Sequence, residues 1–193
     1  MIIGDDAHHD GDFGYFSYTD TSWRTGLEFQ NFYAGIVPAT PNHVGAIYDI
    51  ECQSFADPWT KDSILYEITH EQAICYVAVN SYGDVLGYVT MRHVIDEGQI
   101  CNIAVAKQHQ RKGIGSLLIE ASCAEARRRK MIGLTLEVRV SNQPAIALYE
   151  KYGFAAEGIR KDFYSNPDED GLIMWMYTGQ PVAPGKECNT FNE

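Results

Sequence analysis

The sequence predicts one α/β domain with a mixed, mostly antiparallel sheet and helices on both of its faces. Three observations support this fold class. Residues 113–130 have the apolar periodicity of a long amphipathic helix. Residues 74–79 and 86–91 are β-rich runs joined by a turn sequence. The segments follow the order α-α-β-β-β-α-β-α-β-β, and helices placed between strands of one sheet must cover its faces.

The first half of this order begins after Pro41. The first helix turns Val44, Ile47 and Ile50 toward the interior, and the second starts near Thr60 after a turn. Residues 80–84 have the Asn, Gly and Asp composition of a hairpin turn between the first two predicted strands. Residues 99–106 form the third predicted strand.

The second half begins with the long helix, whose last turn is crowded with cations at residues 127–130. Cations stabilise the negative end of a helix dipole, so this charge pattern marks the C-terminal end of the helix. The remaining predicted elements are a strand, a short helix opened by a proline, and two further strands, at residues 134–138, 144–152, 154–160 and 172–177.

The domain limits follow from the same periodicity. Residues 1–39 are acidic and contain aromatics but show no sustained period, so we expect an N-terminal extension that is partly disordered. Residues 40–177 contain the predicted elements and form the folded domain. Residues 178–193 form a C-terminal tail.

Composition excludes several classes of partner. No apolar run approaches the roughly 20 residues of a membrane span, and the first residues lack a secretory signal, so we expect a cytoplasmic protein without a membrane partner. The net charge of -11 disfavours nucleic acid and favours a cationic or amine-bearing partner. We expect a monomer or a weak homodimer.

The strongest chemical signal is a turn between a strand and the long helix, Gln110-Arg111-Lys112-Gly113-Ile114-Gly115-Ser116. A helix N-terminus offers unpaired N–H groups and partial positive charge, and glycines let phosphates approach the backbone. A tight turn that needs glycine for its conformation alone is about equally consistent with the letters. The segment lacks the third glycine of the dinucleotide fingerprint and the G-K-[ST] of a P-loop.

These residues resemble the GNAT superfamily, whose acetyl-CoA signature [QR]-x-x-G-x-[GA] is matched by Gln110, Gly113 and Gly115. The likeness extends over roughly residues 40–177. It is similar in particular to the RimI-type ribosomal-protein-alanine N-acetyltransferases and their archaeal N-terminal acetyltransferase relatives. The residues that carry it lie at 51–55, 58–60, 102–105, 136–142 and 145–154.

This resemblance implies a GNAT fold, acetyl-CoA as co-substrate, and a protein N-terminus as acceptor, possibly that of a ribosomal protein. It implies that the backbone of Ile103, Ala104 and Val105 pairs with the pantetheine arm and that Asn142 contacts the cofactor. The residues implied to hold the pyrophosphate follow the signature: Gln110, Arg111, Lys112, Gly113, Ile114, Gly115 and Ser116.

The resemblance also assigns the proton-transfer residues, with Glu137 as general base and Tyr149 as general acid. A peptide α-amine has a pKa of about 8 and needs a base at neutral pH, and a departing thiolate is stabilised by a proton. The competing interpretations are a Glu137 paired with Arg139 or a surface lysine, and a Tyr149 that is only a buried aromatic. The residues alone favour those competing interpretations.

Two aromatic residues, Trp59 and Tyr164, are candidates for the walls of the acceptor groove because both are expected in loops. Ordinary capping of the sheet is an equally good explanation. No metal site is predicted, because the acidic and histidine residues at 5–12 match no ligand spacing. Cys101 lacks a histidine and acid arrangement, so direct transfer is preferred to an acyl-cysteine route.

Three hypotheses follow. The first is acetyl transfer to the α-amine of a protein N-terminus. The second keeps fold and cofactor but assigns a small-molecule amine or a lysine side chain as acceptor. The third is a non-catalytic module that binds acetyl-CoA, which would require neither Glu137 nor Tyr149.

Overall fold

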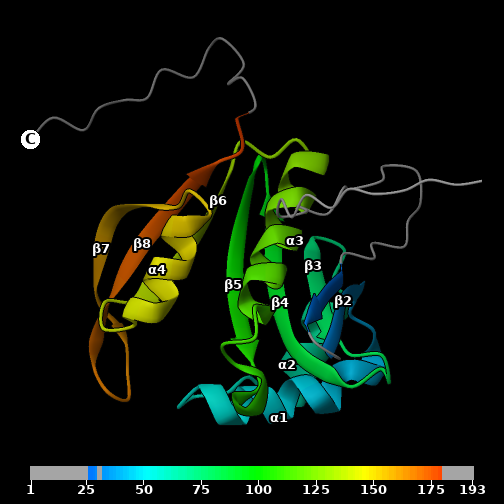
Figure 1. Ribbon diagram of the computed structural model, residues 1–193. Helices are drawn as coiled ribbons and strands as arrows, with labels where there is room; N and C mark the ends of the chain where they lie inside the picture. Colours follow the sequence, from blue (N-terminus) through cyan, green and yellow to red (C-terminus); the bar gives the residue numbers. More distant parts are fainter. Residues whose placement is uncertain (1–25, 30–31, 180–193) are drawn as a thin grey trace, which may run out of the picture.

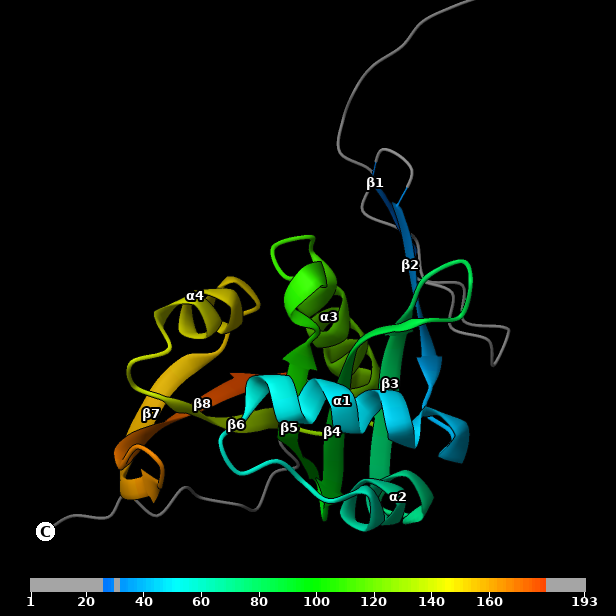
Figure 2. The same ribbon diagram turned by 90° about the horizontal axis from the view of Figure 1, so that it is seen from below.

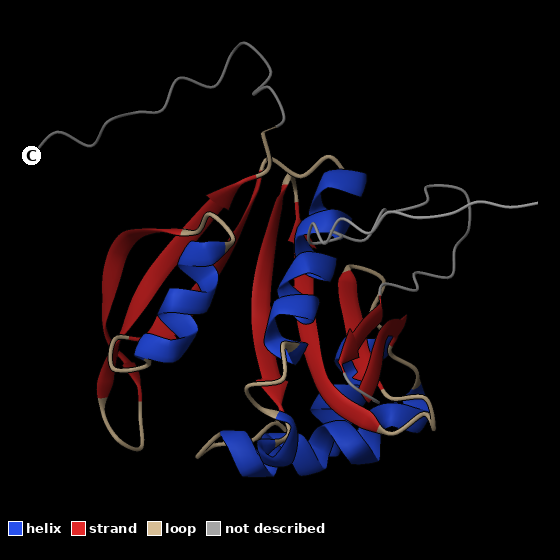
Figure 3. Cartoon of the chain, viewed as in Figure 1, coloured by secondary structure: helices blue, strands red, loops and turns tan. Residues whose placement is uncertain are grey.

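The computed structural model describes residues 26–29 and 32–179, which build one eight-stranded sheet in the order β1-β2-β3-β4-β5-β6-β8-β7 (Figures 1 and 3). Every neighbouring pair is antiparallel except β5 and β6. The predicted mixed, mostly antiparallel sheet is confirmed. The strands are β1 Gly26–Phe29, β2 Phe32–Pro38, β3 Ala73–Val79, β4 Val85–Val94, β5 Glu97–Val105, β6 Gly133–Arg139, β7 Ala155–Tyr164 and β8 Glu169–Tyr177.

Helices cover both faces of the sheet, as the sequence predicts. Figure 2 shows α3 (Ile114–Arg128) and α4 (Gln143–Lys151) on one side and α1 (Val44–Ser54) and α2 (Lys61–Thr69) on the other. The first pair covers a large apolar cluster that includes Leu117, Leu118 and Met174. The second pair covers a smaller cluster around Ile47 and Tyr88. Each helix therefore buries one apolar stripe against the sheet.

The helix boundaries have local causes. The Thr60 hydroxyl accepts the Ser63 backbone N–H at 3.1 Å and caps the start of α2. At α4 the Asn142 side chain accepts the Ala145 N–H at 3.3 Å, and a proline follows within the first turn. No helix in the described part of the chain is long and apolar enough to cross a membrane.

One prediction needs correction at the N-terminal boundary. The sequence predicts that residues 1–39 are an extension outside the domain, yet Gly26–Phe29 and Phe32–Pro38 are both strands of the sheet, and the second of them pairs with β3. Ala34 and Ile36 on this strand are each 1% exposed and belong to the larger core. The strand is short, and the strand that it pairs with, β3, lies some forty residues further along the chain. Residues 1–25, 30–31 and 180–193, including the acidic and histidine segment and nearly all of the predicted tail, lie outside the described residues.

A second correction concerns the segment before β8. The sequence predicts a strand that ends at Arg160, followed by a loop that carries Tyr164. In the structure β7 continues to Tyr164, with register irregularities between Ala156 and Gly158 and between Arg160 and Tyr164. Where the pairing is irregular, apolar and polar residues need not alternate along the strand. A strand is predicted from that alternation, so the end of β7 could not be recognised in the sequence.

Candidate active site

The site begins where two neighbouring strands separate. β5 and β6 are paired in parallel from Glu97 to Ile100 on the β5 side, and the pairing goes no further. The β4 register shifts at the same point, so that Cys101 is an extra residue between Ile100 and Asn102. A bulge bends the strand that carries it. Beyond the bulge β5 and β6 diverge, as Figure 1 shows.

This divergence leaves one edge of β5 available. Within the described chain the predicted cofactor residues Ile103, Ala104 and Val105 pair with β4 and have no strand partner on the β6 side. Unpaired backbone N–H and C=O groups at a strand edge can hydrogen-bond an extended ligand as another strand would. The amide groups of a pantetheine arm fit this donor and acceptor set.

The predicted phosphate-binding turn follows β5 directly. Gly113 caps α3 with a φ of 78°, and Arg111 also has a left-handed φ of 62°. Gln110 donates from its side-chain amide to the Val105 carbonyl at 3.2 Å, which ties the turn to the end of β5. A Cβ at Gly115 would come within 3.2 Å of the Leu148 side chain on α4. The remaining residues of the predicted set, Lys112, Ile114 and Ser116, lie in this turn and the first turn of α3.

The turn has the chemistry that an anionic group requires. Arg111 and Lys112 are exposed beside the N-terminus of α3, whose first N–H groups have no partners within the helix. Helix N-termini and adjacent cations bind phosphates. The residues present therefore fit the pyrophosphate of a coenzyme A.

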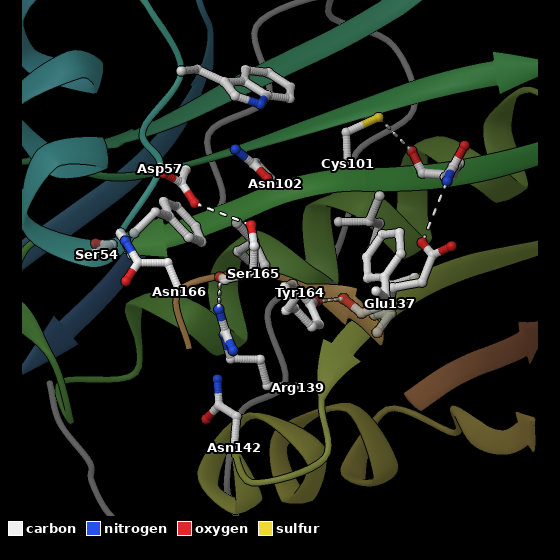
Figure 4. A pocket seen from close by; sticks show the side chains of 18 of the residues that line it. Ser54, Asp57, Cys101, Asn102, Glu137, Arg139, Asn142, Tyr164, Ser165 and Asn166 are labelled. Carbon is white, nitrogen blue, oxygen red and sulfur yellow. Dashed lines mark hydrogen bonds between the residues drawn. The ribbon is translucent and has the colours of Figure 1, made fainter. Parts of the chain in front are cut away.

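A cavity of about 700 Å³ lies at the opening between the two strands. Its lining joins residues from the α1–α2 connection, β5, β6, α4 and the β7–β8 connection (Figure 4). Asn102 lines it together with six of the predicted site residues: Trp59, Ile103, Glu137, Asn142, Tyr149 and Tyr164. The sequence therefore identified residues that are far apart along the chain and converge on one cavity.

Glu137 places a carboxylate in this cavity. It lies on β6 beyond the last residue paired with β5, and its side chain is 14% exposed. Its Oε1 accepts a hydrogen bond from Arg160 Nη1 on β7 at 3.1 Å, and Gln99 Nε2 on β5 lies 3.4 Å from Oε2. The ion pair between Glu137 and Arg139 that was the competing interpretation does not form: Glu137 is ion-paired with Arg160, and Arg139 with Glu169.

Tyr149 lies on α4, is 7% exposed and lines the same cavity. Its ring packs against Phe154 with 5.9 Å between the ring centroids. Burial, followed by the nearby Tyr164, raises the pKa of the Tyr149 phenol well above its ordinary value. The hydroxyl therefore carries its proton throughout the neutral range.

Tyr164 and the β7–β8 connection form one wall. The Tyr164 hydroxyl donates to the backbone carbonyl of Glu137 at 3.0 Å, so the ring is fixed beside the carboxylate (Figure 4). Burial raises the pKa of Tyr164 to about 12. The guanidinium of Arg139 lies over the Tyr164 ring, 4.5 Å from its centroid. This aromatic wall is on a strand rather than in the expected loop.

Arg139 fastens the rest of this wall. Its Nη1 and Nη2 atoms donate to the carbonyls of Pro167 and Ser165 at 2.9 and 3.0 Å, and it is ion-paired with Glu169 at 3.1 Å. Hydrogen bonds from Ser141, with Arg139 contributing, hold the pKa of Glu169 below its usual value. The Arg139 guanidinium thus holds the β7–β8 connection at the edge of the cavity.

The opposite wall comes from the α1–α2 connection, where Trp59 lies in a loop as expected. Its backbone N–H donates to the carboxylate of Glu51 at 2.9 Å. Asp57 on the same connection meets Ser165 of the β7–β8 connection at 3.5 Å, so the two walls touch across the cavity (Figure 4).

Sequence reasoning missed the roles of Glu51, Arg139 and Asp57. Glu51 follows Ile47 by four residues and thus lies on the apolar stripe of α1, an anomaly that could have identified it. Cys101, also in the lining, has a thiol whose pKa is raised to about 11 by burial. Its thiol is neutral at physiological pH, which is consistent with direct transfer.

The free edge of β5, the glycine turn before α3, and a carboxylate and a phenol in one cavity define an acyltransferase that uses a coenzyme A thioester. The family model described as acetyltransferase (GNAT) family matches residues 44–154, and the chain belongs to that family. The acetyl-CoA dependence and the fold expected from the sequence are thereby confirmed.

Individual relatives show which acetyltransferases of this family the chain is similar to. A Bacillus subtilis relative is 38% identical over 130 residues, 67% of this chain and 86% of its own length. The [ribosomal protein bS18]-alanine N-acetyltransferase of Escherichia coli is 35% identical over 131 residues, 67% of this chain and 87% of its own. The resemblance to the ribosomal-protein-alanine N-acetyltransferases is confirmed.

Solved structures agree. The ribosomal-protein-S18-alanine N-acetyltransferase from Escherichia coli superposes with a TM-score of 0.72 at 30% identity, over 80% of this chain and 99% of that one. Ard1 from Thermoplasma volcanium gives 0.68 at 28% identity, over 75% and 97% of the two chains.

Proposed function

We propose that this enzyme transfers the acetyl group of acetyl-CoA to the α-amine of a protein N-terminus, with an N-terminal alanine of a ribosomal protein as the leading candidate. The observation that carries the proposal is the convergence of Glu137 and Tyr149 on the cavity at the opening between β5 and β6. Relatives that cover this chain's catalytic region are named for bS18 alanine acetylation, which supports the choice of acceptor. A ribosomal substrate also fits a cytoplasmic location.

Glu137 acts as the general base in this proposal. The acceptor amine is mostly an ammonium at neutral pH, with a pKa of about 8, and must lose a proton before it attacks. The carboxylate takes that proton directly or through one water, and the neutral amine then attacks the acetyl carbonyl. The C–N bond forms as the C–S bond breaks, and the attacking nitrogen then loses a second proton, which balances the proton that Tyr149 gives to sulfur; no metal ion is required.

Tyr149 supplies a proton to the departing sulfur. Because burial keeps the phenol protonated, the proton is present when the thiolate develops. The same burial disfavours a free thiolate, so proton transfer removes a charge that this environment does not solvate. The backbone N–H groups near Val105 are candidates for stabilising the carbonyl oxygen during attack.

The cofactor residues follow from the same geometry. We assign the pantetheine arm to the free edge of Ile103, Ala104 and Val105, and the pyrophosphate to residues 110–116. Asn142 uses its side-chain oxygen as the cap of α4, which leaves its amide N–H groups as the donors available to the cofactor. Trp59 and Tyr164 form the walls between which the acceptor N-terminus enters.

The test is acetyl-CoA turnover with short peptides, each prepared with a free and with a blocked α-amine. A first set begins with alanine, and other sets vary the first two residues. Turnover confined to free α-amines supports the proposal. Acetylation of blocked peptides at lysine, or of polyamines alone, identifies a different acceptor, and acetyl-CoA binding without turnover on any amine identifies a binding module.

A further inference from the structure

Glu51 is a buried acid that the proposed chemistry does not use. It lies in the last part of α1 and is 0% exposed. A carboxylate removed from water is costly unless its oxygens are hydrogen-bonded. Among the described residues, no Lys, Arg or His is ion-paired with it.

Two neutral donors satisfy this carboxylate. Oε2 accepts the backbone N–H of Trp59 and Oε1 accepts the side-chain Nδ2 of Asn102, both at 2.9 Å. Burial raises the pKa of Glu51, although both hydrogen bonds oppose that shift. Each carboxylate oxygen of Glu51 is therefore hydrogen-bonded to a different segment of the chain.

The two segments are opposite parts of the site. Trp59 belongs to the α1–α2 connection, and Asn102 lies on β5 directly after the Cys101 bulge. Both residues line the cavity. The Asn102 backbone N–H also donates to the buried Thr90 hydroxyl at 3.2 Å, so this point of β5 is held from β4 as well.

We propose that Glu51 is a positioning residue that fixes the acceptor wall at Trp59 to the cofactor strand at Asn102. This inference rests on the function proposed above. A bridge through one side chain sets the distance between the place where the peptide enters and the strand edge that holds the thioester arm. Without the bridge, β5 remains paired in the sheet, but the α1–α2 connection with Trp59 is no longer held. The loss should therefore weaken binding of the acceptor peptide and not of acetyl-CoA.

The experiment compares steady-state constants for an accepted peptide and for acetyl-CoA in the wild type, Glu51→Gln, and Glu51→Gln/Asn102→Asp. In the single variant the amide at position 51 cannot accept from both donors. In the double variant that amide can donate to the new carboxylate at position 102 while its oxygen accepts from Trp59.

We expect Glu51→Gln to raise the peptide KM about tenfold, the size that accompanies loss of a hydrogen bond to a charged group, and to leave the acetyl-CoA KM within about twofold of the wild-type value. The double variant should recover most of the loss. A role in folding alone would lower Tm without separating the two constants, and the double variant would not restore the peptide KM.

Glu67→Gln is the matched control. Glu67 is another buried glutamate, 5% exposed on α2, but it pairs with Arg92 and does not line the cavity. It should lower Tm without changing the peptide KM. If Glu51→Gln fails to fold, Asn102→Ala removes the other end of the bridge and must raise the peptide KM by a similar factor.

Equal kinetic constants in the wild type and in folded Glu51 or Asn102 variants would overturn the positioning role and leave the proposed function intact. The absence of wild-type turnover on every free α-amine peptide would refute the proposed function itself. The wild type is therefore measured first.

Discussion

The two sides of the cavity are built from different parts of the polypeptide. The proposed cofactor side uses backbone: the free edge of β5 and the glycine-capped start of α3. The proposed acceptor side uses side chains, and Glu51 and Arg139 each hold one connecting segment against the sheet. A backbone site depends on local conformation and tolerates changes of side chain, whereas the acceptor walls depend on single residues that are distant in sequence.

The largest expected effect lies between the two sides, at the proposed proton-transfer residues. Glu137→Gln should lower kcat by roughly 10²–10⁴-fold, because general base catalysis contributes that much. Acetyl-CoA affinity, measured by calorimetry, should stay within about twofold. A parallel loss of affinity would show that Glu137 supports the cofactor site rather than the chemistry.

Arg139→Lys tests the acceptor side. Lysine cannot donate to two loop carbonyls and a carboxylate in one plane, so the β7–β8 connection should loosen. We expect the peptide KM to rise about tenfold at saturating acetyl-CoA, with the acetyl-CoA KM unchanged. If the peptide KM and the acetyl-CoA KM rise together, the assignment of separate backbone and side-chain sites to the two substrates is wrong.

Gly113→Ala tests the cofactor side. A residue with a side chain pays roughly 1 kcal/mol at a φ of 78°, and the distortion falls on the turn before α3. Acetyl-CoA affinity should fall about fivefold while the peptide KM at saturating acetyl-CoA stays constant. Gly45→Ala is the control, since Gly45 lies in α1 and nothing lies within 4 Å of an added Cβ.

The smallest effect concerns the far end of α3, where Glu125 is 3% exposed and bonded to Arg128 and Arg129. Burial favours a higher pKa, but these bonds outweigh it and hold the pKa of Glu125 below 4.5. A lowered folded-state pKa contributes stability above about pH 4.5 that is lost as pH falls through the folded value.

Glu125→Gln should therefore lower the free energy of unfolding by about 1 kcal/mol at pH 7, and the difference from wild type should shrink in acid. Chemical denaturation at pH 7, 5 and 3.5 measures this. A difference that stays constant with pH would mean that the charge of Glu125 is not what holds the helix end.

The same contrast explains how much of the molecule could be predicted. The helices and the six later strands were found because their periodicity is local. The glycine turn was found because a helix start and its glycines are adjacent in sequence. Strand β2 was missed because its burial comes from β3, a partner some forty residues further along the chain.

Within the site, a local motif could not reveal the ties made by Glu51 and Arg139. Glu51 meets Asn102 across 51 residues, and Arg139 meets Ser165 across 26. Only the fold brings these partners together. Tyr164 lines the cavity, but it lies on a strand and not in the expected loop. The irregular register of β7 removes the alternation of apolar and polar residues from which a strand is predicted.

The chain passes once from β5 through α3 to β6; it leaves β5 at the end that is separated from β6 and enters β6 at the end where the two strands pair. The strand edge and phosphate turn are therefore encoded before residue 132, and the proposed proton-transfer pair after it. A gene crossover at residues 129–132 between related chains would exchange the acid and base together while leaving the thioester-binding backbone whole. Such chimaeras would combine the proposed Trp59 wall of one parent with the proposed Tyr164 wall of the other, and would show which wall decides the choice of acceptor.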